Sequence, residues 1–302
     1  MDYIEARRAE VERALAGILP PVPECPQVVH DAMAYSLLAG GKRLRPILCL
    51  VSAEAVGGRR DDALPAACAI ELIHTYSLIH DDLPAMDDDT MRRGRPTLHV
   101  VAGEGMAILA GDGLLTQAFL HLADQPRGSD AELIARKLRV IQLIADAAGP
   151  VGMVGGQAID LASVTPDPQG RIAAPLDERG VRTMHGKKTG ALIRAAARAG
   201  AIMGGGHAEQ VAAIDAAAGE FGLAFQIVDD ILDVAGASAQ LGKTAGKDAA
   251  AGKPTYPSLY GVEVSQRMAT ECLERAEAML ASAGVADPRL IGIGRWIVER
   301  SN

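Results

Sequence analysis

The chain is poor in aromatic residues, in cysteine and in long apolar runs, and each shortage excludes a class of protein. Aromatic side chains make up 3% of the 302 residues, while 33 glycines and abundant alanine favour closely packed helices over a sheet sandwich. The four cysteines form no C-x-x-C pair, which indicates buried thiols in a reduced, cytoplasmic protein. They are Cys25, Cys49, Cys68 and Cys272. No run of 18 apolar residues is present, so we expect no stable membrane insertion.

Basic charge is also in short supply, because 38 acidic residues outnumber 30 basic ones and the net charge is -8. A protein that binds nucleic acid needs clustered positive charge, so this balance argues against DNA or RNA as a partner. Residues 1–12 are rich in charge and lack the apolar core of a signal peptide, which again favours a cytoplasmic location. No linker divides the chain, so residues 1–302 are predicted to form a single domain.

Over residues 81–95, acidic side chains are separated from basic ones along the chain. The acidic part comprises Asp81, Asp82, Asp87, Asp88 and Asp89, and the basic part comprises Arg92, Arg93 and Arg95. Carboxylate oxygens suit Mg²⁺, which binds one or two protein carboxylates together with substrate phosphates. Guanidinium groups suit phosphate oxygens. The stretch therefore predicts a site for a divalent cation and a polyanion, and a solvated acidic turn is the alternative.

A second aspartate cluster follows much later in the chain, in an apolar and helix-periodic context. It comprises Asp229, Asp230 and Asp233. Asp229 and Asp233 are four residues apart and share one helix face, where two like charges destabilise an isolated helix. A cation between them removes that repulsion. Two such clusters facing each other across a pocket would hold several metal ions on one diphosphate.

Together the patterns Asp-Asp-x4-Asp and Asp-Asp-x-x-Asp resemble the two aspartate-rich motifs of trans-isoprenyl diphosphate synthases. The resemblance runs from about Tyr35 to Tyr256 and is greatest to bacterial farnesyl diphosphate synthases, with geranylgeranyl diphosphate synthases next. It implies an all-α, isoprenoid-synthase-type helical bundle around a deep central pocket, with the two acidic motifs opposed at its mouth. A homodimer and three Mg²⁺ ions are implied as well.

The implied metal ligands are the aspartates of both motifs. They are Asp81, Asp82, Asp87, Asp88, Asp229, Asp230 and Asp233. We expect Pro84 to distort the helix end, so that Asp87 or Asp88 turns back towards Asp81. Pattern matching selects Asp87 and helix arithmetic favours Asp88, so the choice between them is open.

The resemblance also implies a site for isopentenyl diphosphate. The pattern Gly-Lys-x-x-Arg-Pro supplies Lys42 and Arg45, and His74 and Arg93 complete the site. His74 lies seven residues before Asp81, about 20° from it around a helix, although a lone helical histidine is more often structural.

The allylic diphosphate is expected to bind near Arg92 and near a second basic pair. Lys187-Lys188-Thr189-Gly190 is predicted to open a helix, whose N-terminus favours an anion, and the resemblance places Lys188 and Thr189 at the allylic site. Gln157 and Asp160 share a helix face and have either a pocket role or a packing role. Residues 236–254, with Lys243 and Lys253, are either a lid that closes over diphosphate or a surface loop.

The implied chemistry is head-to-tail (1'-4) prenyl transfer. Isopentenyl diphosphate attacks an allylic cation formed from dimethylallyl or geranyl diphosphate, and pyrophosphate takes the final proton. Arg92, Lys188 and Lys243 would stabilise the departing pyrophosphate, while the Thr189 hydroxyl and the Gln226 amide oxygen face the cation.

Product length is expected to depend on Tyr76, five residues before Asp81. Helix geometry places Ser77 about 40° from Asp81 and Tyr76 about 140° from it, but serine is too small to stop a growing chain. In the resembling enzymes a bulky aromatic at this position goes with a fifteen-carbon product, and a smaller residue goes with twenty carbons. Farnesyl diphosphate is therefore predicted, with geranylgeranyl diphosphate as the alternative. Tyr76 as an ordinary core residue is the competing interpretation.

Three other functions are considered. The order His74, His80-Asp81, Asp229 resembles the ligands of helical metal-dependent phosphohydrolases, but it leaves the second aspartate pair and the arginines unexplained. A regulatory prenyltransferase subunit would have lost one acidic motif, and this chain keeps both. A terpene cyclase would not need the isopentenyl diphosphate residues.

Overall fold

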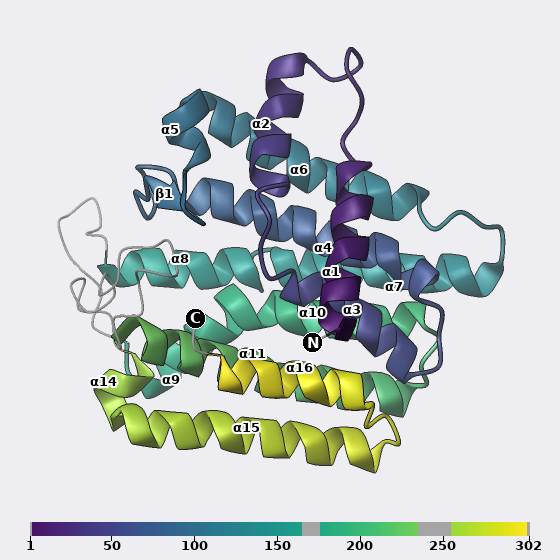
Figure 1. The fold of residues 1–302 in the computed structure, drawn as a ribbon, viewed down its shortest axis with the longest axis vertical. Helices are drawn as coiled ribbons and strands as arrows, with labels where there is room; N and C mark the ends of the chain where they lie inside the picture. Colours follow the sequence, from purple (N-terminus) through teal and green to yellow (C-terminus); the bar gives the residue numbers. More distant parts are fainter. Residues whose placement is uncertain (1, 165–175, 235–254, 301–302) are drawn as a thin grey trace. The chain divides into compact units, whose positions relative to one another are not determined.

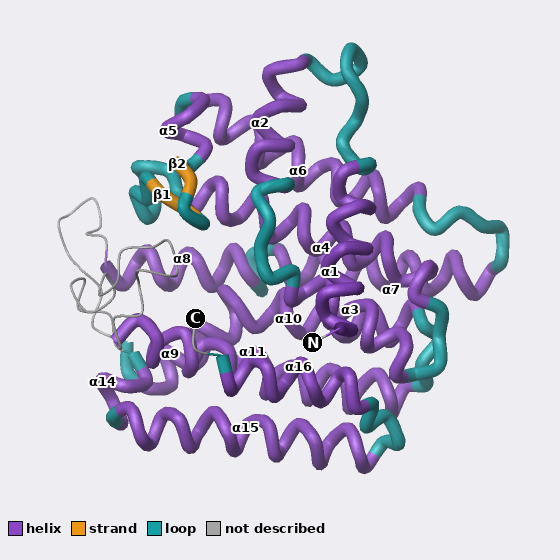
Figure 2. The backbone as a smooth tube through the Cα atoms, viewed as in Figure 1, coloured by secondary structure: helices purple, strands orange, loops and turns teal. Residues whose placement is uncertain are grey.

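The structure is a computed structural model that describes residues 2–164, 176–234 and 255–300. Helices dominate these ranges, and the strands in them are β1 (Met91–Arg92) and β2 (Arg95–Pro96), which form one antiparallel hairpin (Figure 2). The predicted all-α class is confirmed.

The chain groups into two compact units. Unit 1 comprises Met1–Gln142 and Ala199–Gly206, and unit 2 comprises Leu143–Arg198 and His207–Asn302. The chain passes from one unit to the other within α7 (Ala131–Ala148) and α10 (Ala191–Met203). The single domain expected over residues 1–302 stays a prediction.

Besides the hairpin, unit 1 contains six helices ahead of α7 in the described chain (Figure 1). They are α1 (Asp2–Ala16), α2 (Gln27–Leu37), α3 (Leu44–Ala55), α4 (Arg60–Asp81), α5 (Leu98–Ala102) and α6 (Glu104–Asp124). Helix α4 is the centre of this unit, because every residue from Pro65 to Ile73 is buried. A helix that is buried on all sides must be covered by others, and α4 packs against α3 and α6.

Unit 2 is built around α11 in the same way. Its described elements are α8 (Met153–Val164), α9 (Glu178–His185), η1 (Gly186–Gly190), α11 (Ala208–Val234), α14 (Tyr256–Tyr260), α15 (Val262–Ser282) and α16 (Pro288–Glu299). Helix α11 packs mainly against α15. Its buried face includes Phe221, whose ring lies so close to Gly294 of α16 that an added Cβ there would sit 2.4 Å from it.

A buried arginine fixes the loop between α2 and α3. Arg43 has a left-handed backbone (φ 49°) and a side chain with no exposed surface. Its guanidinium donates to Glu71 of α4 at 2.6 Å, to Glu12 of α1 at 2.8 Å and to the Leu37 carbonyl of α2 at 2.7 Å. One side chain therefore joins three helices at the start of a fourth.

Three segments are long and apolar enough, by length and composition, to cross a membrane. They are Glu104–Asp124, Ala131–Ser163 and Ala208–Val234. Half of the apolar window of Ala208–Val234 is buried inside the protein, against one third for the other two. The expectation of no membrane insertion therefore stays a prediction.

Replacing Arg43 should destabilise the protein strongly. Arg43→Met leaves Glu71, which is 2% exposed, as a buried carboxylate without its ion partner, and removing one partner of a buried pair costs about 3–5 kcal/mol. Urea unfolding measures the loss. Arg59→Ala breaks an exposed pair with Asp61 and should change the free energy of unfolding by less than about 1 kcal/mol. Equal midpoints for the two variants would contradict the role given to Arg43.

Candidate functional site

The acidic stretch of unit 1 is a turn that folds back onto the end of α4. The helix ends at Asp81, and the backbone amide of Asp87 donates to the Asp81 carbonyl at 2.8 Å. Asp89 donates in the same way to the Asp82 carbonyl at 3.2 Å. The expected return of the chain towards Asp81 is therefore confirmed for the backbone of Asp87. Asp87 and Asp88 are both exposed, and the choice between them as a ligand stays a prediction.

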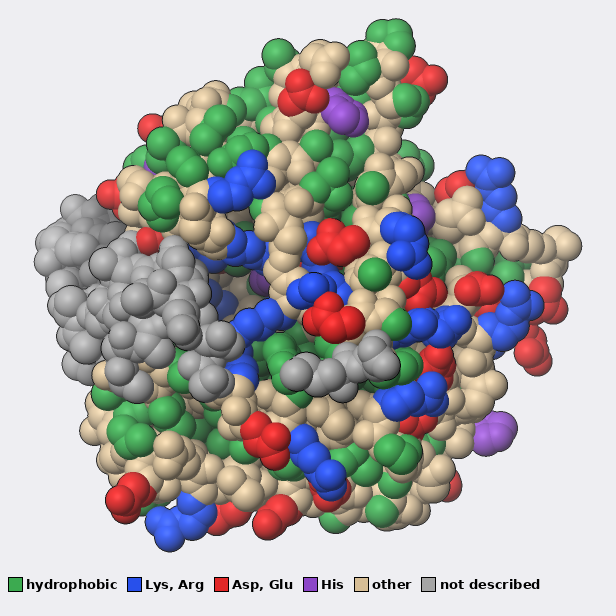
Figure 3. All heavy atoms as spheres, viewed as in Figure 1, with side chains coloured by type: hydrophobic (Ala, Val, Ile, Leu, Met, Phe, Trp, Pro, Cys, Tyr) green, Lys and Arg blue, Asp and Glu red, His purple; other side chains and the backbone are tan. Residues whose placement is uncertain are grey.

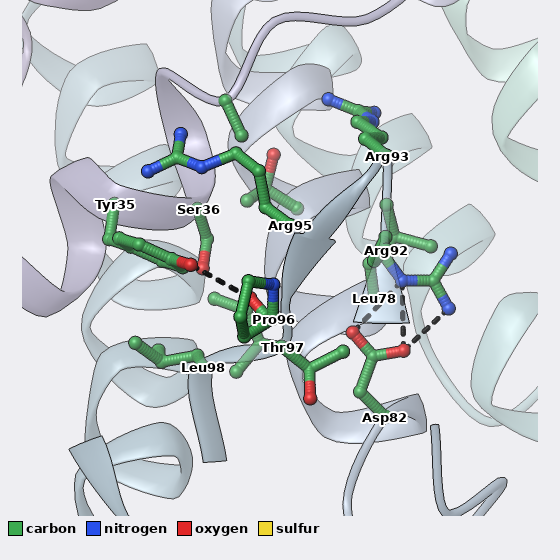
Figure 4. A pocket seen from close by; sticks show the side chains of 13 residues that line it. Tyr35, Ser36, Leu78, Asp82, Arg92, Arg93, Arg95, Pro96, Thr97 and Leu98 are labelled. Carbon is green, nitrogen blue, oxygen red and sulfur yellow. Dashed lines mark hydrogen bonds and ion pairs between the residues drawn. The ribbon is translucent and has the colours of Figure 1, made fainter. Parts of the chain in front are cut away.

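Asp82 is buried and held by Arg92. Its two carboxylate oxygens accept from Arg92 Nε at 2.8 and 2.9 Å, and Oδ1 also accepts from Nη2 at 2.6 Å (Figure 4). Burial acts to lower the Arg92 pKa, but the hydrogen bonds and charge of Asp82, with Asp89 and Asp81, outweigh it and raise that pKa. Asp82 therefore orients the arginine.

Arg93 lies in the tight hairpin turn that directly follows Arg92. Arg93 (φ 52°) and Gly94 (φ 73°) are the two loop residues between the paired Arg92 and Arg95, and two-residue hairpin loops favour positive φ. Arg93 consequently points away from Asp82 (Figure 4) and donates to the Gly40 carbonyl. An added Cβ on Gly41 would lie 2.6 Å from the Arg93 guanidinium, so that glycine makes room for it.

Arg93 belongs to a cationic cluster around His74. The His74 pKa lies well below its ordinary value, first because of burial and then because of the charges of Arg45, Arg93, Arg92 and Arg43. His74 is therefore neutral near pH 7. Lys42 is exposed on the loop just before Arg45, which lies in the first turn of α3. Fixed cations beside a neutral imidazole, which can donate an N–H, form a suitable site for an anion.

In unit 2 the second acidic motif lies on α11. Asp230 is buried, where it accepts from the Tyr256 backbone amide at 3.0 Å and from Gln226 Nε2 at 2.9 Å. Asp229 and Asp233 are half-buried, on another face of the helix. Like Asp82 in unit 1, the second aspartate of this pair is thus held by the protein itself.

Arg300, near the C-terminus, is ion-paired with Asp229. Its Nη2 lies 2.6 Å from Asp229 Oδ1 and 2.6 Å from the Phe225 carbonyl, and its guanidinium lies 3.8 Å from the centre of the Phe225 ring. Its side chain is 3% exposed. No motif near residue 300 marks this contact in the sequence.

Lys187 and Lys188 do not open a helix, and that prediction is wrong. They lie in η1, a π-helical turn that joins α9 to α10 without a break, because both flanking residues keep right-handed helical backbone. No helix N-terminus is therefore available there for an anion. The turn is packed tightly: an added Cβ on Gly156 of α8 would lie 2.2 Å from the Lys188 nitrogen, and one on Gly222 of α11 would lie 3.4 Å from Gly190 Cα.

Helix α8 supplies two polar side chains to this region. Asp160 is buried and pairs with Lys188 Nζ at 2.5 Å, which directs the lysine. Within the described residues, neither amide atom of Gln157 has a hydrogen-bond partner although both are buried. Buried polar atoms are nearly always paired in a working protein, so Gln157 is a candidate for a contact with a bound molecule.

Comparison with known proteins places the chain in a family. The polyprenyl synthetase family model matches residues 26–283. The chain belongs to the polyprenyl synthetase family. The resemblance to trans-isoprenyl diphosphate synthases seen in the sequence is thereby confirmed, and so is prenyl transfer as the class of reaction.

Relatives that are named for different products or reactions align with nearly the whole chain. The geranylgeranyl diphosphate synthase of Cyanophora paradoxa is 45% identical and aligns over 100% of this chain and 97% of its own. The dimethylallyltranstransferase of Fischerella ambigua is 44% identical over 100% of this chain and 84% of its own. A solved FPP/GFPP synthase from Zymomonas mobilis is 38% identical and superposes with a TM-score of 0.84, covering 98% of this chain and 97% of that one.

The carboxylates of this polyprenyl synthetase fit Mg²⁺ chemistry. Among the described residues, no three histidine, cysteine or acidic side chains form a closed metal cluster. Mg²⁺ does not need one, because it usually keeps several waters and binds through one or two carboxylates plus substrate phosphates. Asp81 in unit 1 and Asp233 in unit 2 would supply such oxygens, as would Asp229 beside its ion partner Arg300.

Several predictions stay untested. Lys243, Lys253 and the expected lid over residues 236–254 lie outside the described residues. The two acidic motifs belong to different units, so their facing each other across a pocket stays a prediction. Sequence reasoning missed Arg43, which occupies an unspecified position within Gly-Lys-x-x-Arg-Pro, and it missed Arg300.

The low His74 pKa predicts how stability changes with pH. In the unfolded chain the pKa of this histidine is near 6.5. Below about pH 6.5 the unfolded state therefore binds a proton that the folded state does not bind. Stability is then full above pH 6.5 and falls by at most about 1.4 kcal/mol per pH unit below it. His74→Gln should reduce this loss in urea unfolding at pH 7.5 and 5.5. The exposed His207→Gln is the control, and equal losses in the two variants would refute the assignment.

Proposed function

We propose that the protein is a Mg²⁺-dependent prenyltransferase that condenses isopentenyl diphosphate with dimethylallyl and geranyl diphosphate to give farnesyl diphosphate. One observation carries this proposal: two neighbouring arginines diverge into different surroundings. Arg92 is bound to Asp82 beside the acidic turn, whereas Arg93 lies over the Gly40–Gly41 loop beside His74. Two separate anion sites suit a reaction between two diphosphates.

The aspartates divide into two roles. Asp81, Asp87 and Asp88 of unit 1, with Asp229 and Asp233 of unit 2, are the ligands we assign to Mg²⁺, which neutralises the charge of the allylic diphosphate when bound. Asp82 and Asp230 are committed to Arg92, Gln226 and the Tyr256 amide. They orient those groups, and metal contact is their secondary role.

The remaining residues hold the substrates and stabilise charge. Lys42, Arg45, His74 and Arg93 fix isopentenyl diphosphate so that its double bond attacks the allylic carbon. Arg92, Lys188 and Lys243 stabilise the departing pyrophosphate, with Lys188 held in place by Asp160. The Gln226 amide nitrogen is committed to Asp230, so its oxygen is the atom that faces the cation, together with the Thr189 hydroxyl. Pyrophosphate accepts the final proton.

A fifteen-carbon product is favoured by Tyr76. Its side chain is 8% exposed and it packs edge-on against His80 within α4. A large, fixed ring one turn from the metal end can stop a growing chain. Geranylgeranyl diphosphate is the alternative product, because the relative from Cyanophora paradoxa is named for it.

We further propose a cytoplasmic homodimer in which a second copy covers exposed apolar faces of unit 1. Leu109 and Leu120 on one face of α6 are 53% and 61% exposed, and Ile134 and Leu138 on α7 are 51% and 67% exposed. Nucleic acid is not a fitting partner, because acidic and basic side chains intermingle on the face shown in Figure 3. Exposed apolar residues that gather on a helix face are typical of an interaction surface, and we assign these two faces to a second copy of the chain.

Incubation with isopentenyl and dimethylallyl diphosphates plus Mg²⁺, followed by product chromatography, tests the proposal. Asp81→Ala and Asp229→Ala should each abolish turnover and weaken binding of Mn²⁺, used as a spectroscopic probe, while circular dichroism stays helical. Asp61→Ala, an exposed aspartate at the other end of α4, is the matched control. Near-normal Mg²⁺-dependent turnover in either motif variant would show that the two-motif mechanism is wrong.

The two arginines should separate the two substrates. Arg92→Ala is expected to raise the KM for the allylic diphosphate at least tenfold, and Arg93→Ala that for isopentenyl diphosphate, because each loses a charge-assisted hydrogen bond worth about 1.5–3 kcal/mol. Arg92→Lys keeps a charge beside Asp82 and guards against a folding defect. Arg95, which lies over the Tyr35 ring, provides the control Arg95→Ala. Identical KM profiles for the first two variants would refute the division.

Tyr76→Ala should lengthen the product. Removing the ring opens the floor of the chain pocket, so the C20 to C15 ratio in the products should rise severalfold with geranyl diphosphate as the starter. Tyr76→Phe keeps the ring and should still stop at fifteen carbons. If Tyr76→Ala also stops cleanly at fifteen carbons with normal turnover, Tyr76 is an ordinary core residue.

A further inference from the structure

The His80 side chain makes two contacts: it hydrogen-bonds to the neighbouring helix α6, and its ring packs against the ring of Tyr76. Its Nε2 lies 3.0 Å from the Ile108 carbonyl of α6, where it acts as the donor. Its ring meets the Tyr76 ring edge-on, with centroids 5.6 Å apart and planes at 82°. The two residues are four apart on α4, so His80 lies one turn nearer to Asp81 on the same face.

The histidine reaches α6 because residue 111 is glycine. An added Cβ on Gly111 would lie 2.1 Å from His80 Nε2, 2.5 Å from Cδ2 and 2.9 Å from Cε1. All three atoms belong to the ring, whose position the Ile108 hydrogen bond fixes. Any larger residue at 111 must therefore displace the imidazole. The imidazole of His80 thus fills the space that a side chain at residue 111 of α6 would occupy.

We propose that the contact between His80 and Gly111 is a positioning element for product length: it fixes the Tyr76 ring and so sets the depth at which a prenyl chain stops. This inference rests on the proposed function, in which Tyr76 is the floor. In a helix a tyrosine ring has two common χ1 rotamers and points back towards the N-terminus. An immobile ring one turn above it removes part of that freedom. A displaced His80 would leave Tyr76 free to move aside under a longer chain.

We expect more prenyl chains to grow past fifteen carbons, while the prenyl-transfer reaction itself is retained. The edge-on contact between the two rings has the strength of an ordinary aromatic pair, so its removal should raise the C20 to C15 product ratio by roughly two- to tenfold. Asp81 lies about 100° from His80 around the helix, so the carboxylates keep their places. At matched low conversion, the product ratio does not depend on how much of a variant folds, because only folded enzyme makes product.

The test compares three variants in the assay with isopentenyl and geranyl diphosphates. Gly111→Ala displaces His80. His80→Gln keeps a donor for the Ile108 carbonyl but removes the ring. Gly113→Ala is the matched control, since its Cβ would meet Met33 of α2, 2.9 Å from the sulfur, and not His80. The first two should raise the C20 to C15 ratio, and the control should leave it at the wild-type value.

A double substitution separates positioning from general packing. If the contact acts through Tyr76, Gly111→Ala should add nothing to the ratio in a Tyr76→Ala background, and an additive shift overturns the inference. Unchanged ratios in both Gly111→Ala and His80→Gln, with a wild type that stops at fifteen carbons, also overturn it while the proposed function stands. A wild type that runs on to twenty carbons overturns the farnesyl assignment, and the inference falls with it.

Discussion

The buried guanidinium of Arg43 is the constraint on which the unit 1 site depends. It joins Glu12, Glu71 and the Leu37 carbonyl from three helices, and its left-handed backbone turns the chain into α3. Desolvating one cation is costly unless each donor finds an acceptor. Because this network is satisfied, the Lys42 loop and the first turn of α3 with Arg45 are held between α2 and α4, where Arg45 acts on His74. In the proposed function, the site for isopentenyl diphosphate is thus held in place by the fold itself.

The same principle governs both acidic motifs. Each begins with two aspartates, and in each the second is buried and used by the protein: Asp82 holds Arg92, and Asp230 holds Gln226 and the start of α14. The first aspartate keeps more exposed surface. A pair of adjacent carboxylates therefore need not be two equal ligands. One positions a neighbouring cation or amide, and in the proposed function the other binds the metal. In the second motif that other carboxylate, Asp229, is also ion-paired with Arg300.

The sequence was sufficient for features that are local or periodic. The helical class follows from composition and from the resemblance, and the turn of Asp87 back to Asp81 follows from Pro84. The π-helical turn at Lys187 could not be predicted, because it depends on close approach by Gly156 and Gly222 from helices distant in sequence. Arg43 and Arg300 were missed for a related reason. Their partners lie 28 and 71 residues away, and no spacing rule reaches so far.

The roles we propose for residues of helix α4 would let one family keep its chemistry and vary its product. His74 and Asp81 lie about 20° apart around the helix, whereas Tyr76 lies about 140° from Asp81. The side chains to which we assign substrate and metal binding thus lie on a different face of the helix from the one to which we assign product length. We therefore expect a substitution on the second face to change pocket depth without moving the carboxylates. Relatives named for geranylgeranyl diphosphate and for FPP/GFPP can therefore share most of this chain's length. In the proposed function, product length then depends on a few ring contacts such as that between Tyr76 and His80, which fold and motif alone do not determine.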